Sequence, residues 1–113
     1  MALKLRAELP RAVAARGPAS HHAEIALGEG PLTQRLESAI LALSEWRGPE
    51  SSTCPSDAAR AIGGEKWREL MVEARRIARK LAKSGQVDIT QRGEVLNPDI
   101  EWRGPVRIRS ARR

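Results

Sequence analysis

A row of cationic side chains is the part of this sequence whose residue types and spacing suit a chemical role. These side chains fall on one stripe of the segment 66–84, which has clean helical periodicity. Guanidinium and ammonium groups in such a row neutralise phosphates, and an arginine can also bond to the edge of a base. The stripe consists of Arg68, Arg75, Arg76, Arg79 and Lys83, and only Val72 interrupts it.

The opposite face of the segment 66–84 is apolar, which predicts one amphipathic helix packed on a core. Trp67 is expected to be buried at the junction with the preceding helix. The basic face has two interpretations, a polyanion-binding surface or a solvated charged face. The second interpretation notes that Glu65 and Glu69 occupy the first turns, while the cations lie in the C-terminal half and complement the helix dipole there.

Two shorter helices are predicted before this one. The segment 33–47 keeps its apolar residues at helical spacing. Cys54 is expected to cap the next helix, with Pro55 at the first helical position and Asp57 in the acidic position of a capping box. A pair of glycines then allows a tight turn into the basic helix, which gives the helix-turn-helix pattern.

A β-hairpin is expected after the basic helix. Apolar and polar residues alternate over 87–97, and Arg92 with Gly93 is predicted to form the tip. Three helices followed by a hairpin describe a winged helix-turn-helix, a mainly α fold with a small β-hairpin.

The last part of the chain, residues 104–109, again alternates apolar with basic residues. We expect an additional strand beside the hairpin, with Arg107 and Arg109 facing outward. Together these elements predict a single winged-helix domain over residues 32–109, followed by a frayed tail over residues 110–113.

The segment 1–31 is expected to form a flexible N-terminal arm, because its later part mixes glycine, proline, serine and charges without a period. Leu3, Leu5 and Leu9 predict a short helix that ends at Pro10. Two adjacent histidines lie in the arm, but no further ligand stands at metal-binding spacing, so no metal site is predicted.

The bulk composition limits the class of partner. The 113 residues carry a formal net charge of +6, which favours nucleic acid or an acidic protein surface. The single cysteine, Cys54, has no intramolecular disulfide partner, which predicts a cytoplasmic location. Since no apolar run approaches the ~20 residues that span a bilayer, no membrane partner is predicted.

No catalytic constellation is found, and the chain is expected not to be an enzyme and to need no cofactor. A cysteine nucleophile requires a nearby base, but the only histidines lie in the N-terminal arm. Cys54 at a helix start suits either a redox-sensing thiolate or a small cap residue without chemistry of its own.

Three stretches of the sequence resemble one protein family. They read TCPSDAARAIG, WRELMVEARRIARKLAKSGQVDITQRG and RGPVRIR, and the resemblance covers roughly residues 32–109. The family is an uncharacterised, mostly bacterial winged-helix-like family, domain-of-unknown-function family 3253. The resemblance implies a winged-helix fold and carries no established activity.

DNA binding is the function that these features favour. The basic helix 66–84 would enter a groove, and the wing 87–97 would contact a neighbouring groove or the backbone. Arg92 at the wing tip would assist, and Arg107 and Arg109 on the last strand would add to the contacts.

The alternative function is a protein–protein interaction adaptor with no nucleic-acid partner. Trp46 and Trp102 discriminate between the two functions, because an exposed indole suits an interface anchor. Trp102 lies between Glu101 and Arg103 in a predicted linker, where it either anchors a partner or covers the edge of the small core.

Overall fold

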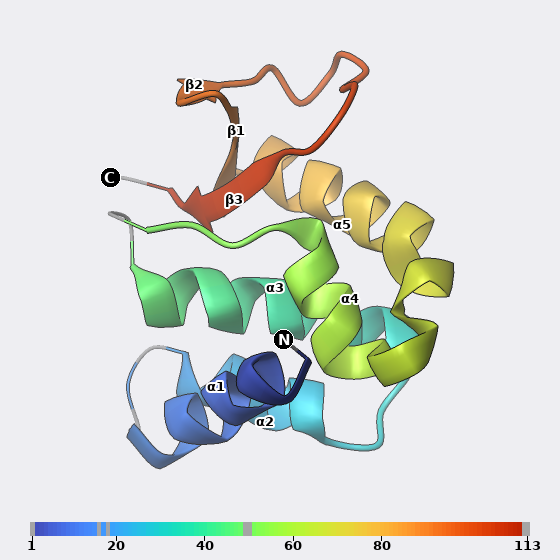
Figure 1. Cartoon of the computed structure of the whole chain (residues 1–113). Helices are drawn as coiled ribbons and strands as arrows, with labels where there is room; N and C mark the ends of the chain where they lie inside the picture. Colours follow the sequence, from blue (N-terminus) through green and yellow to red (C-terminus); the bar gives the residue numbers. More distant parts are fainter. Residues whose placement is uncertain (1, 16, 18, 49–50, 112–113) are drawn as a thin grey trace.

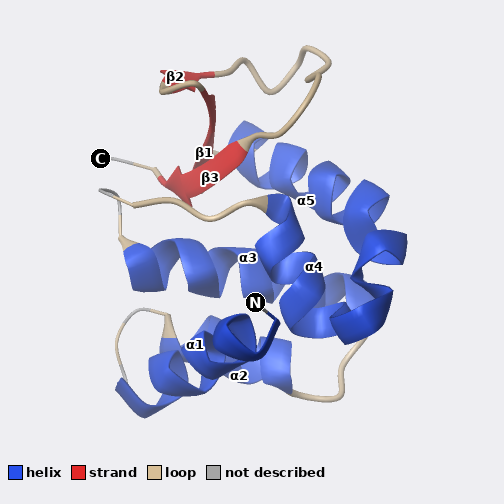
Figure 2. Ribbon diagram, viewed as in Figure 1, coloured by secondary structure: helices blue, strands red, loops and turns tan. Residues whose placement is uncertain are grey.

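Helices make up most of the fold, and a small sheet lies at one end of it (Figure 2). The computed structural model describes residues 2–15, 17, 19–48 and 51–111, with side chains from residue 8 onward. The elements are α1 Ala2–Ala15, α2 Ser20–Leu27, α3 Leu32–Arg47, α4 Pro55–Gly63, the 3-10 helix η1 Gly64–Leu70, α5 Met71–Lys83, β1 Val87–Gln91, β2 Glu94–Val95 and β3 Arg107–Ser110.

The sheet is antiparallel, with the strand order β2-β1-β3. Arg92 and Gly93 connect β1 to β2 with φ angles of 53° and 83°, positive at both positions as a type I′ hairpin turn requires. Ile108 of β3 lies opposite Ile89 of β1, and on its other edge it exchanges two backbone hydrogen bonds with Thr53. The predicted hairpin, its tip and the additional strand are confirmed.

Helix α3 lies at the centre, with α1 and α2 on one side and the sheet on the other (Figure 1). Leu36, Ile40 and Leu43 of α3 are fully buried and join Leu81 of α5 and Ile108 of β3 in one hydrophobic cluster. This aliphatic core therefore holds α5 and the sheet in place. Because α3, α4 and α5 precede the hairpin, the architecture is winged-helix-like, as predicted.

The N-terminal segment differs from the predicted flexible arm, because it forms the helices α1 and α2. Helix α1 also continues through Pro10 instead of ending there, at the cost of the hydrogen bond that a residue with an N–H would donate. Small alanines give only a weak hydrophobic signal in a sequence, yet they let these helices approach α3 closely. The buried residues are Leu9, Ala12, Ala19, Ala23 and Ala26.

Two of the predictions for the chain ends concern residues that the structure describes only in part. The side chains of Leu3 and Leu5 lie outside the described part of the chain. Of the tail predicted to fray, Ser110 is the last residue of β3, and residues 112–113 lie outside the described residues.

The basic helix also differs from the prediction, because the α-helix begins at Met71 and is preceded by the 3-10 helix η1. Leu70 packs so closely on Gly63 that a Cβ there would lie 2.8 Å from the Leu70 Cδ1 atom. The chain turns sharply after α4, and it forms the more tightly wound 3-10 helix before α5 starts. Trp67 consequently lies in η1 and is only partly buried, which corrects its predicted place in the core.

Candidate nucleic-acid interface

Helix α5 positions the cationic stripe by burying its apolar face. Ala74, Ile77, Ala78 and Leu81 are each at most 1% exposed. Since residues three and four apart share one face of a helix, the basic residues between them are directed away from the core. Val72 on this outer face is 84% exposed.

Arg79 does not project freely from the stripe. Its Nη1 atom donates hydrogen bonds of 2.6 Å to the carbonyl oxygens of both Pro98 and Ile100. Its guanidinium carbon lies 4.2 Å from the ring centroid of Trp102, a cation–π distance. These contacts fasten part of the connection between β2 and β3 to α5. We call this part, residues 97–105, the 97–105 segment.

Arg75 extends the same attachment by one turn. It donates to the carbonyl oxygens of Trp102 at 3.4 Å and Gly104 at 3.3 Å. From the other side, Gln91 of β1 donates to the carbonyl oxygens of Arg103 and Pro105. The 97–105 segment therefore lies against one flank of α5, where sequence reasoning placed an open cationic surface.

Several other cations are paired with carboxylates. Arg76 bonds to Glu73 one turn earlier. Lys83 lies 3.3 Å from Asp99 of the 97–105 segment. Such exposed pairs contribute about 0–1 kcal/mol each, so a phosphate can replace the carboxylate at low cost.

A shallow hollow of about 270 Å³ on α5 brings three of the eight predicted residues together. Its lining combines three predicted residues with Lys80, which sequence reasoning missed. Lys80 stands four residues after Arg76, so helical spacing already placed it on this side. Its ammonium group lies 3.2 Å from Glu37 of α3. We call the lining residues the α5 cationic face: Arg76, Arg79, Lys80 and Lys83.

One protein-family model matches most of the chain. A family model described as "Protein of unknown function (DUF3253)" matches residues 33–111. The chain belongs to this family. No curated protein matches the chain. The matched part of the DUF3253 protein runs from the start of α3 to the end of β3, so it contains the α5 cationic face and leaves out α1 and α2.

The remaining predicted site residues lie apart from the α5 cationic face of the DUF3253 protein. Arg68 lies in η1, where its guanidinium carbon is 4.6 Å from the ring centroid of Trp67. Arg92 is exposed at the hairpin tip, beyond the opposite end of α5. Thirteen residues of α5 separate these two ends, which is about 20 Å of helix.

The two arginines of β3 also have partners within the chain. Arg107 donates to the hydroxyl and the carbonyl oxygen of Ser52, both at 2.9 Å. Arg109 lies 3.6 Å from a carboxylate oxygen of Asp88 on the neighbouring strand. Neither residue lines the hollow on α5.

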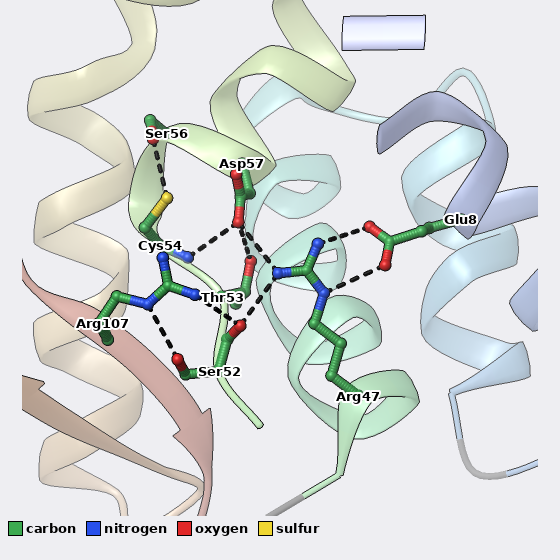
Figure 3. Close-up of polar contacts among 8 residues, drawn as sticks. All are labelled: Glu8, Arg47, Ser52, Thr53, Cys54, Ser56, Asp57 and Arg107. Carbon is green, nitrogen blue, oxygen red and sulfur yellow. Dashed lines mark hydrogen bonds and ion pairs between the residues drawn. The ribbon is translucent and has the colours of Figure 1, made fainter. Parts of the chain in front are cut away.

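A second polar cluster joins α1, α3 and α4 (Figure 3). Arg47 donates to both carboxylate oxygens of Glu8, at 3.1 and 2.7 Å, and to Asp57 at 3.2 Å. The Asp57 carboxylate also accepts hydrogen bonds from the Thr53 hydroxyl and the Cys54 backbone N–H. The predicted cap of α4 is thereby confirmed, and the Cys54 sulfur lies 2.9 Å from a neighbouring hydroxyl.

This cluster lowers the pKa of Asp57. Burial by itself raises the pKa of Asp57, but hydrogen bonds from Thr53 and Cys54 and the charge of Arg47 outweigh burial and lower it. The pKa of Arg47 is raised, first by its hydrogen bond to Glu8. The folded protein therefore favours the ionised forms of Asp57 and Arg47. Their charged hydrogen bonds make the cluster a structural junction between α1, α3 and α4.

The two tryptophans proposed as interface anchors differ in exposure. Trp102 is 7% exposed, and its Nε1–H donates to the carbonyl oxygen of Asn97 at 3.3 Å. It covers the edge of the core, which was one of the two roles left open. Trp46 at the end of α3 is 39% exposed.

The histidines lie apart from any metal-binding cluster in the described part of the chain. Among the residues that the structure describes, no group of three or more metal-binding side chains is gathered. His22 instead lies 3.5 Å from Glu45 of α3. Within the described ranges, none of the helices combines the length and the apolar character needed to cross a membrane.

Proposed function

We propose that this DUF3253 protein binds nucleic acid through phosphate contacts of the α5 cationic face. The observation that carries the proposal is the hollow on α5, whose four lining residues are all cations. Closely spaced cations attract the phosphate backbone and release its condensed counterions, which supplies most non-specific affinity.

The hydrogen bonds within the chain leave this charge largely in place. Arg75 and Arg79 donate to carbonyl oxygens, which are neutral, so both guanidiniums keep their full charge. Helix α5 contains five cations and one carboxylate, a net charge of +4. The nearby Glu37 and Asp99 reduce this to +2 for the whole neighbourhood.

The test is the affinity for a labelled DNA duplex, measured by fluorescence anisotropy at low salt. We expect Lys80→Gln/Lys83→Gln to bind about tenfold or more weakly, because two phosphate contacts are lost. The matched control is Arg11→Gln/Lys66→Gln, which removes two charges from exposed positions in α1 and η1. The proposal fails if both double variants lose affinity equally, since net charge alone would then explain the binding.

A further inference from the structure

We infer that this protein contacts only the sugar–phosphate backbone of its nucleic acid, and that α5 does not enter a major groove to read bases. The inference rests on the proposed function, because it specifies how the α5 cationic face binds. Three observations carry it: the space beside α5, the charge of the segment that fills this space, and the residues at the start of the helix.

The 97–105 segment occupies space that a groove-bound helix needs. A helix with its side chains is about 10–12 Å wide, and the major groove is about 12 Å wide, so a bare helix just fits. Here four hydrogen bonds from Arg75 and Arg79 fix a second stretch of backbone against the flank of α5. The helix and the segment together are too wide for the groove.

The charge of the segment opposes insertion as well. The Asp99 side chain is 72% exposed and lies beside Lys83 near the end of the helix. Glu101, two residues later, is also exposed. If α5 were inserted, these carboxylates would face the phosphates that line the groove, and like charges repel.

The start of α5 offers little that reads bases. Helix-turn-helix proteins use the N-terminal residues of the recognition helix for contacts with base edges. In this protein these residues are Met71, Val72 and Glu73, and Glu73 already accepts a hydrogen bond from Arg76. The cations follow in the later turns, where they can approach phosphates across the surface of the nucleic acid.

The experiment measures the wild-type protein with three duplexes of equal length and unrelated sequence, one AT-rich, one GC-rich and one mixed. We expect their affinities to agree within about threefold, since phosphate contacts carry no sequence information. Methylation of guanine N7, which lies in the major groove, should proceed at the same rate in bound and free duplex.

The possible outcomes distinguish this inference from the proposed function on which it rests. Protection of guanine N7, or a preference of more than about tenfold for one duplex, would overturn backbone-only binding and leave nucleic-acid binding intact. If none of the duplexes binds at low salt, the proposed function fails, and the inference fails with it. Equal affinities with unchanged N7 methylation support both.

Discussion

The guanidinium of Arg79 lies 4.2 Å from the ring centroid of Trp102 while it donates hydrogen bonds to two carbonyl oxygens of the same segment. One side chain thus joins α5 to the connection between β2 and β3. The positive charge remains, but the side chain is fixed by contacts within the protein. This double role explains why a helix rich in arginine presents a narrower free cationic surface than its sequence indicates.

The attachment should depend on the planar shape of the guanidinium. We expect Arg79→Lys to lower the free energy of unfolding by about 1–2 kcal/mol, because an ammonium group cannot both stack and serve two carbonyls in this way. Amide hydrogen exchange in the 97–105 segment should also become faster. Arg76→Lys is the control, since Arg76 is exposed and pairs with Glu73 on the same helix. Unchanged exchange in the Arg79 variant would contradict the account.

Trp102 should be the tryptophan that stabilises the fold most. We expect Trp102→Ala to cost about 3–5 kcal/mol in a urea titration, because the side chain is 7% exposed and its indole N–H is bonded. Trp46→Ala is the comparison, since Trp46 is 39% exposed and should cost distinctly less. Equal losses for the two variants would show that Trp102 is not a core residue.

Asp57 should make the protein sensitive to acid. The folded state lowers the pKa of Asp57, so its contribution is present above the ordinary aspartate pKa of about 4 and is lost as the pH falls through the lower folded value. We expect Asp57→Asn to be about 1–3 kcal/mol less stable at pH 7, because hydrogen bonds to a charged group are lost. The gap between variant and wild type should shrink below about pH 4.

The measurement is the free energy of urea unfolding of both proteins at a series of pH values. Burial raises the pKa of Glu45, and the charge of His22 partly opposes this rise. A raised carboxyl pKa makes the folded state relatively more stable as the pH falls, which is opposite to the effect of Asp57. Because Glu45 is present in both proteins, its effect cancels in the difference. A gap that stays constant from neutral to strongly acidic pH would contradict the role assigned to Asp57.

Glu8 should couple the N-terminal helix to the rest of the protein. It forms a bidentate ion pair with Arg47, and the side chains of Glu8 and Arg47 are 15% and 20% exposed. A double-mutant cycle with Glu8→Gln and Arg47→Gln should give a coupling energy of about 1–3 kcal/mol. The same cycle on the exposed pair Glu73 and Arg76 should give about 0–0.5 kcal/mol. A coupling for Glu8 no larger than that would show that the ion pair does not hold α1.

Local sequence signals predicted several elements correctly. Cys54 and Asp57 gave the capping box of α4, and Arg92 with Gly93 gave the hairpin tip, because caps and tight turns depend on a few adjacent residues. The strand predicted within residues 104–109 followed from simple alternation and is observed as β3, Arg107–Ser110. These features need no knowledge of distant parts of the chain.

Contacts between distant residues could not be predicted in the same way. Arg79 bonds to carbonyl oxygens 19 and 21 residues away, and every residue has a carbonyl, so the sequence carries no mark of the acceptor. Trp67 was misplaced because a 3-10 helix changes the direction of its side chains relative to an α-helix. Helix α2 and the part of α1 beyond Pro10 were missed because alanine contributes little to a hydrophobic pattern.

The salt dependence of DNA affinity tests the central claim most directly. If the four residues of the α5 cationic face each neutralise one phosphate, the logarithm of the association constant should fall against the logarithm of salt concentration with a slope of about −3 to −4. The slope for Lys80→Gln/Lys83→Gln should be shallower by about 2. A flat response in the wild-type protein, or an equal slope in the variant, would contradict phosphate binding by this face.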